Sequence, residues 1–118
     1  MTDIVILGGA RTAIGTFGGS LAGTAPIDLG TVAAKAAMER AGVEGGQIGN
    51  VVFGHVINTE PRDMYLSRVA AMQAGVPDTV PAMNVNRLCG SGVQAIVSVI
   101  QSLTLGDEIG RASCRERV

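Results

Sequence analysis

The chain is poor in aromatic residues, in histidine and in charge. Of its 118 residues only 3% are aromatic, one is a histidine and 16% are charged, with a formal net charge of −1. So small a negative excess gives no electrostatic attraction to nucleic acid or to an anionic membrane surface. We therefore expect neither a nucleic acid nor a membrane as a partner.

The sequence also lacks membrane-length apolar runs and the residues of a zinc site. We find no apolar run that approaches the length of a membrane span, and the first three residues lack the positive stretch of a secretory signal. One histidine and two widely separated cysteines cannot supply a standard zinc shell, so no metal is expected. A cytoplasmic location is the default expectation, and there Cys89 and Cys114 are free or catalytic thiols rather than a disulfide.

Short β-rich runs alternate with helix-length stretches along the chain. Buried strands are predicted at residues 4–7, 51–56 and 82–86. Helices are predicted over residues 26–42, 64–74 and 91–105, with proline or glycine at their ends. This alternation predicts an α/β fold, βαβαβα in order, with a mostly parallel sheet and right-handed crossovers.

The third predicted helix is unusual because residues 93–105 contain no charged residue. Its predicted core stripe, widened by Ala95 and Val99, is made of Val93, Ile96, Val97, Ile100 and Leu103. A helix that is apolar on nearly all sides is normally buried on every side. One sheet and its helices cannot bury it in a chain of this size, so the sequence predicts a further layer from another domain or another subunit.

The residues after Asp107 differ in character from the rest. Residues 108–118 hold three of the nine basic residues and show no apolar periodicity. They can be back-translated into a string that looks like a common sequencing-library adapter read in frame. We therefore expect a domain over residues 1–107 and a non-native tail over residues 108–118, the alternative being an ordinary solvated tail.

The segment N-R-L-C-G-S-G, residues 86–92, lies between a predicted strand and a predicted helix. Cys89 would lie at or just before the helix amino terminus, where unpaired N–H groups and the helix dipole favour the negative charge of a nucleophilic thiolate. The same N–H groups can bind the oxyanion that forms when sulfur attacks a thioester, and Gly90 and Gly92 leave room for a substrate. The alternative is a buried structural cysteine beside glycines that only form a tight turn.

A rival interpretation uses the same residues. Residues 90–95 satisfy the G-x-G-x-x-A pattern of dinucleotide-binding folds. Against it, no strand ending in a ribose-binding acid follows, and the first strand-to-helix turn carries G-G-A-R, residues 8–11, instead. A dinucleotide-binding domain therefore stays the weaker alternative.

Three motifs resemble thiolases. The block N-R-L-C-G-S-G-x-Q-A-I, residues 86–96, looks like their nucleophile segment, and G-G-A-R-T-A-I-G-T-F-G-G-S-L, residues 8–21, looks like their first loop. V-V-F-G-H-V-I-N-T-E-P-R-D-M-Y-L-S-R-V-A, residues 51–70, is similar to the second strand and helix of biosynthetic and β-ketothiolase members. The motifs follow in the family's order, and the resemblance extends over nearly all of residues 3–107.

The resemblance implies the amino-terminal half of the thiolase fold, in which two similar halves stack as α/β/α/β/α layers, with residues 1–107 as a partial domain. It implies an acetyl-CoA C-acyltransferase that condenses two acyl-CoA molecules or cleaves a 3-ketoacyl-CoA by thiolysis. Coenzyme A thioesters would be substrates, and no cofactor would be bound permanently. The parent enzyme would be a cytoplasmic homodimer or homotetramer of fatty-acid or storage-polymer metabolism.

The resemblance also implies a site. Cys89 would be the acyl-thioester nucleophile, with its own N–H in the oxyanion hole, on a loop supported by Asn86, Leu88, Gly90, Ser91 and Gly92. The histidine, the asparagine-associated water and the second cysteine of thiolases belong to the carboxy-terminal half. His55 and Cys114 are not expected to replace them, because the family does not use the first position and the second lies in the foreign-looking tail.

Two alternatives share these features, namely a ketoacyl-synthase-type condensing enzyme and a non-catalytic remnant. C-G-S-G and the first-loop motif favour the thiolase branch. Without a general base, the isolated chain is expected to acylate slowly at most and not to turn over. It would also lack the fourth strand of the fold, so that the strand at residues 4–7 and the third helix stay exposed, and we expect it to be unstable or to aggregate.

Overall fold

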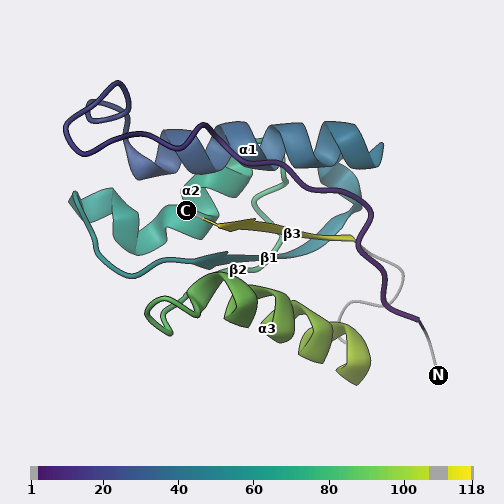
Figure 1. Ribbon diagram of the computed structural model, residues 1–118. Helices are drawn as coiled ribbons and strands as arrows, with labels where there is room; N and C mark the ends of the chain where they lie inside the picture. Colours follow the sequence, from purple (N-terminus) through teal and green to yellow (C-terminus); the bar gives the residue numbers. More distant parts are fainter. Residues whose placement is uncertain (1–2, 107–111, 118) are drawn as a thin grey trace.

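The computed structural model describes residues 3–106 and, as backbone, residues 112–117. Within these residues the sheet has three parallel strands in the order β2-β1-β3. The strands are β1 (Ile48–Gly54), β2 (Ala82–Val85) and β3 (Ala112–Arg117). Figure 1 shows α1 (Pro26–Ala41) and α2 (Leu66–Gln73) on one face of the sheet and α3 (Ser91–Leu105) on the other. The predicted α/β class with a parallel sheet is confirmed.

Helix α1 has residues at both ends that favour a helix terminus. Pro26 lies in its first turn, where the missing N–H has no partner to lose, and Asp28 lies at the positive end of the helix dipole. At the other end Gly42 has a φ of 66°, a left-handed conformation that glycine adopts without strain. Its N–H donates to the Glu39 carbonyl, and the predicted ends of the first helix are confirmed.

The second predicted helix is two elements. A 3₁₀-helix, η2 (Pro61–Tyr65), precedes α2, and another, η1 (Gly45–Gln47), precedes β1. The Asp63 carboxylate accepts the Glu60 N–H and holds this first turn tight. The regular α-helix therefore begins two residues later than predicted, and Gly75, with a φ of 97°, follows its end as expected.

The hydrophobic core lies between β1 and the helices α1 and α2. Side chains alternate along β1, so Val51 and Phe53 join this core while Val52 lies on the α3 face, and all three are fully buried. A parallel strand covered on both faces explains the continuous apolar run in the sequence. The helices contribute Ile27, Ala34, Met38, Leu66, Ala70 and Ala71.

Residues 4–7 do not form a strand, so that prediction is wrong. Ile6 is 80% exposed, and no strand pairing involves this run. The edge of β1 opposite β2 is instead paired with β3, although no strand was expected after α3. The chain that follows this run passes along α1 (Figure 1), where Arg40 Nη1 donates to the Gly9 carbonyl at 3.1 Å.

Helix α3 has the predicted bounds but not the predicted orientation. Ser91 and Ala95 are buried against the sheet, whereas Val93 is 65% exposed and Val97 and Ile100 are also exposed. The predicted core stripe therefore lies mostly on the outer face. Small residues face the sheet because α3 approaches β1 closely, and its larger apolar side chains are left uncovered by the described residues.

The apolar character of α3 corrects one further expectation. Together with the preceding turn, residues Leu88–Leu105 are long and apolar enough to cross a membrane, judged by length and composition alone. The core helix of a soluble protein passes the same test. The expectation that no such run exists is wrong, but the run itself does not favour a membrane over a protein layer.

Candidate active site around Cys89

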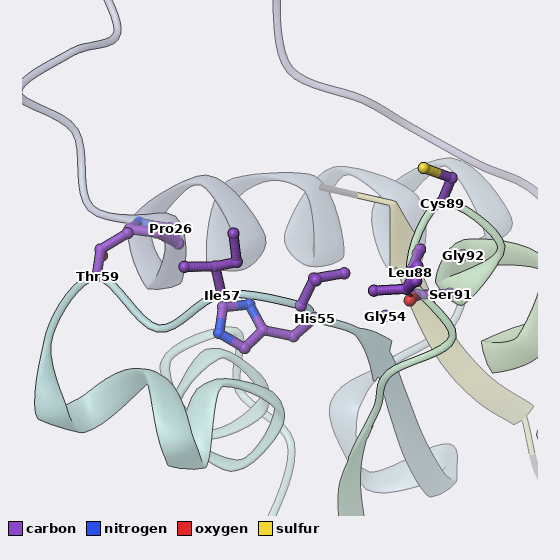
Figure 2. A pocket seen from close by; sticks show the side chains of 10 residues that line it. Pro26, Gly54, His55, Ile57, Thr59, Leu88, Cys89, Ser91 and Gly92 are labelled. Atoms are coloured by element: carbon purple, nitrogen blue, oxygen red, sulfur yellow. Dashed lines mark hydrogen bonds between the residues drawn. The ribbon is translucent and has the colours of Figure 1, made fainter.

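A pocket of about 570 Å³ lies where β1 and β2 end and α3 begins. Ligands of parallel α/β sheets bind outside the carboxyl ends of the strands, so this is the expected place for a site. In Figure 2, Pro26 and Thr59 lie at one end and Cys89 at the other, with His55 and Ile57 between them. The full lining is Pro26, Gly54, His55, Val56, Ile57, Thr59, Leu88, Cys89, Ser91 and Gly92.

Cys89 lies in a tight turn between β2 and α3. The Gly90 N–H donates to the Arg87 carbonyl at 3.0 Å, and the Ser91 N–H donates to the Leu88 carbonyl at 3.0 Å. Within this turn Cys89 is exposed and its thiol is free. The alternative of a buried structural cysteine is therefore wrong, and a molecule in the pocket can reach the sulfur.

The backbone of this turn is strained at Leu88. Its φ is 46°, and it is the one non-glycine residue with a positive φ in the described part of the chain. A left-handed conformation costs a residue with a β-carbon about 1–2 kcal/mol, so neighbouring contacts must hold it. One of these is the Asn86 side chain, whose Oδ1 accepts the Leu88 N–H at 3.0 Å.

The first turn of α3 leaves backbone donors free beside Cys89. The N–H groups of Gly92 and Val93 make no hydrogen bond within residues 3–106. This is usual for the first turn of a helix, where the dipole also places partial positive charge. The arrangement can stabilise an anion or a developing oxyanion next to the thiol.

His55 follows the last residue of β1 and lines the same pocket. Its N–H donates to the Val85 carbonyl at 3.0 Å, and its ring Nε2 lies 2.9 Å from Asn58 Oδ1. The ring is therefore tied to its own loop. His55 thus lies directly after the end of β1.

Asp63 is a fully buried carboxylate that fixes Thr59 in the pocket wall. Its Oδ2 accepts the Thr59 N–H at 2.6 Å, the Thr59 hydroxyl at 2.7 Å and the Glu60 N–H at 3.2 Å. Burial raises the pKa of Asp63, but these hydrogen bonds and the nearby charge of His55 lower it. The net pKa lies below the ordinary value of 3.8, so the carboxylate is ionised at neutral pH.

The structure brings the residues of the predicted loop together. Leu88, Cys89, Ser91 and Gly92 line the pocket, while Asn86 and Gly90 belong to the same turn without lining it. The interpretation of Cys114 lies outside the described side chains.

Five lining residues were not predicted from the sequence, namely Pro26, Gly54, Val56, Ile57 and Thr59. Of these, Gly54 could have been predicted from the sequence, since a glycine at the end of a buried strand often marks a close backbone approach.

Other hollows and clusters offer less chemistry. A hollow of about 400 Å³ at the far end of α3 is lined by Ile100, Gln101, Thr104 and Leu105, none of which titrates near neutral pH. Within the described residues, no group of three His, Cys, Asp or Glu side chains could hold a metal ion. The pocket at Cys89 is therefore the candidate site.

Comparison with known proteins identifies related sequences. Residues 4–109 match the family model described as Thiolase, N-terminal domain. The chain is 59% identical over 105 residues to Beta-ketothiolase BktB of Cupriavidus necator and 47% identical over 107 residues to an Acetyl-CoA acetyltransferase of the same organism. These alignments cover 89% and 91% of this chain but only 27% of each relative.

Solved structures give the same result. Human mitochondrial 3-ketoacyl-CoA thiolase in complex with CoA has a TM-score of 0.84 at 35% identity, covering 86% of this chain and 26% of that one. The Bacillus anthracis acetyl-CoA acetyltransferase has a TM-score of 0.82 at 38% identity, covering 88% and 26%. The chain thus spans about a quarter of the length of the proteins it matches.

Proposed function

Because the chain belongs to the thiolase family, matching its amino-terminal domain over residues 4–109, we propose that the whole protein is a coenzyme A-dependent acyltransferase in which Cys89 receives the acyl group. One observation supports this residue above others. Cys89 is a free, exposed thiol at a pocket, in the turn that leads into the first turn of α3. The relatives named as β-ketothiolase and acetyl-CoA acetyltransferase support the reaction class.

In the proposed first step, the Cys89 thiolate attacks the carbonyl carbon of an acyl-CoA. A carbon–sulfur bond forms, and the carbonyl electron pair moves onto oxygen, where the Cys89 N–H and the free N–H groups of α3 stabilise it. Collapse of this intermediate breaks the bond to the coenzyme A sulfur, which leaves as a thiolate. The acyl group remains on Cys89 as a thioester.

The proposed second step transfers the acyl group to the α-carbon of a second acyl-CoA. The reverse reaction cleaves a 3-ketoacyl-CoA with the coenzyme A thiol. Both directions need a base for the cysteine and an acid/base at the α-carbon. We propose that these groups come from the part of the whole protein that this chain, at 27% of its relatives' length, does not span.

Several finer properties complete the proposal. Coenzyme A thioesters would be the substrates, which the CoA complex of a structural relative supports. No cofactor would be bound permanently. The whole protein would be a cytoplasmic homodimer or homotetramer of fatty-acid or storage-polymer metabolism. The uncovered apolar face of α3 supports further packing, and light scattering after size exclusion tests the assembly.

We propose that residues 108–118 are not native. The support is the adapter-like back-translation of these residues. The source DNA should be sequenced beyond the Asp107 codon by a method that does not use this sequencing adapter. Different codons are expected there, and finding the same codons would contradict the proposal.

Acetylation of Cys89 tests the function. The protein expressed from the complete source gene should be incubated with acetyl-CoA, quenched in acid and digested for mass spectrometry. We expect the acetyl group on the Cys89 peptide, and we expect Cys89→Ala to lower thiolysis of acetoacetyl-CoA by at least about 1,000-fold. The control Ser102→Ala, a change outside the pocket lining, should retain both activities.

Two outcomes would contradict the proposal. Acetylation that persists in Cys89→Ala would show that another residue carries the acyl group. Condensation that requires a malonyl thioester, without cleavage of acetoacetyl-CoA, would favour a ketoacyl-synthase-type enzyme.

A further inference from the structure

Ser91, two residues after Cys89 in the chain, is a buried serine. The residue is only 5% exposed although it lines the pocket. Its Oγ accepts the Arg87 N–H at 2.8 Å and donates to the Leu88 carbonyl at 2.6 Å. One side chain thus bonds to two successive residues of the turn that precedes the cysteine.

These two hydrogen bonds hold the backbone of the turn at Leu88, its strained residue. The Leu88 carbonyl also accepts the Ser91 N–H at 3.0 Å. Ser91, the first residue of α3, therefore donates two hydrogen bonds to this carbonyl, one from its backbone and one from its hydroxyl. Leu88 has the unfavourable φ of 46°, which an unsupported loop would relax. Asn86 holds the Leu88 N–H from the other side. The conformation is therefore fixed by side chains on both sides of Leu88.

The position of Cys89 depends on this conformation. Cys89 itself is exposed and lies between Leu88 and Gly90, whose N–H is bonded to the Arg87 carbonyl. A sharp, strained strand-to-helix turn is how other enzymes present a nucleophile above a sheet. Relaxation at Leu88 would swing the Cys89 sulfur relative to the free N–H groups of α3.

We infer that Ser91 is a positioning residue for Cys89. Its hydroxyl holds the Arg87–Leu88 peptide segment so that the thiol and the free N–H groups of Gly92 and Val93 face the same thioester carbonyl. Ser91 forms no bond to substrate and does not exchange protons with it. This inference rests on the proposed function, because it concerns the acylation of Cys89.

The test compares three variants of the protein expressed from the complete source gene. Ser91→Ala removes the hydroxyl, Ser91→Thr keeps it, and Ser102→Ala makes the same change as the first at the far end of α3. For each, kcat and KM for acetoacetyl-CoA thiolysis are measured. In parallel, alkylation of Cys89 by iodoacetamide, which needs exposure but no alignment with a carbonyl, is followed on its peptide by mass spectrometry.

We expect Ser91→Ala to lower kcat by about 10- to 100-fold, the usual effect of a small misplacement of a reacting group, with KM changed by less than about 3-fold. Its alkylation rate should stay within about 2-fold of the wild type. Ser91→Thr should recover most of the lost kcat, and Ser102→Ala should behave as the wild type.

Four outcomes would overturn the inference. An unchanged kcat in Ser91→Ala would show that the hydroxyl does not position the thiol. Equal losses in Ser91→Ala and Ser91→Thr, or losses of kcat and alkylation in the same proportion, would show a purely structural role. If the wild-type Cys89 is not acetylated at all, the proposed function fails first, which is a distinct result, and the inference falls with it.

Discussion

A β-carbon added to Gly54 would lie 2.7 Å from the carbonyl carbon of Ser91 and 2.9 Å from the nitrogen of Gly92. Real β-carbons essentially never come within 3.0 Å of another residue's heavy atoms, and the atoms met here are backbone, which cannot rotate away. The end of β1 therefore sets how closely the first turn of α3 approaches the sheet. Because Cys89 precedes that turn, Gly54 also sets the depth of the candidate site.

Substitution of Gly54 by alanine should impair the site. The added methyl must push the start of α3 away from β1, so we expect acetylation of Cys89 by acetyl-CoA to slow by about 10-fold or more. The matched control is Gly46→Ala, where a β-carbon would meet nothing within 4 Å. Quenched-flow acetylation followed by mass spectrometry measures both, and equal rates in the two variants would contradict the assigned role of Gly54.

The buried carboxylate of Asp63 should make stability depend on acid pH. Its folded pKa is lower than the ordinary value of 3.8, so the folded state binds fewer protons than the unfolded state as the pH falls through this range. The stabilisation is therefore fully present above about pH 5 and is lost as the pH drops below 3.8 towards the folded pKa. Urea unfolding of the protein from the complete source gene, repeated across acid pH, measures the loss.

The variant Asp63→Asn isolates that contribution. An amide cannot carry the charge that the Thr59 and Glu60 donors stabilise, so we expect a thermal midpoint lower by roughly 5–10 °C at pH 7. The acid-dependent part of the stability should shrink in the same variant. Asp78→Asn, in an exposed loop, is the control. An unchanged pH dependence in Asp63→Asn would contradict the assignment.

Asn84 clamps the junction of η2 and α2 to β2. Its Oδ1 accepts the Ser67 N–H at 2.9 Å, while its Nδ2 donates to the carbonyls of Asp63 and Met64 at 3.2 Å each. In Asn84→Ala the Ser67 amide should exchange hydrogen about 10-fold faster, because its acceptor is gone. Asn84→Asp keeps an acceptor and should leave that amide protected while still loosening η2.

Amide hydrogen exchange resolved to single residues distinguishes the two variants. Two results would show that the Asn84 side chain does not hold the junction. One is fast exchange of the Ser67 amide in Asn84→Asp, and the other is an exchange rate in Asn84→Ala that equals that of the wild type.

The outer face of α3 should drive self-association of the 118-residue chain. Val93 and Val97 are exposed there and lie one helical turn apart. The pair Val93→Glu and Val97→Lys should reduce sedimentation of large species, because it breaks the apolar face and adds a favourable pair of charges spaced four residues apart. Ala95→Glu, which buries a charge against the sheet, should instead unfold the chain. A monodisperse wild-type chain with a cooperative thermal transition would contradict this prediction.

Removal of residues 108–118 should change the state of residues 4–7. The cut deletes β3 and opens the edge of β1 to another strand. Residues 4–7 are β-branched and aliphatic, so we expect their amides to become protected from exchange in the shortened chain as they pair there. Equal exchange in both chains would show that β3 does not exclude this run from the sheet.

Local signals in the sequence predicted most of the fold. Pro26, Gly42 and Gly75 mark helix ends through backbone geometry that each residue carries with it, and the bounds of α3 follow in the same way. The turn around Cys89 was predicted for the same reason, since a short segment between strand and helix determines it.

Relationships between distant segments were harder to predict. The edge of β1 is paired with β3 and not with residues 4–7, and the periodicity of a segment does not say which of two segments pairs at an edge. Likewise the inward face of α3 is set by its close approach at Gly54, so the small Ala95 is buried while Val93 is not. Hydrophobicity alone predicts that Val93 is buried.

The exposed apolar run at residues 4–7 also matters during synthesis. It leaves the ribosome before any residue of β1, so it has no sheet edge to join until β1 has been translated. A chaperone that binds short apolar segments would meet this run first. The amino terminus is thus an apolar segment that needs protection in the nascent protein well before Cys89 has been made.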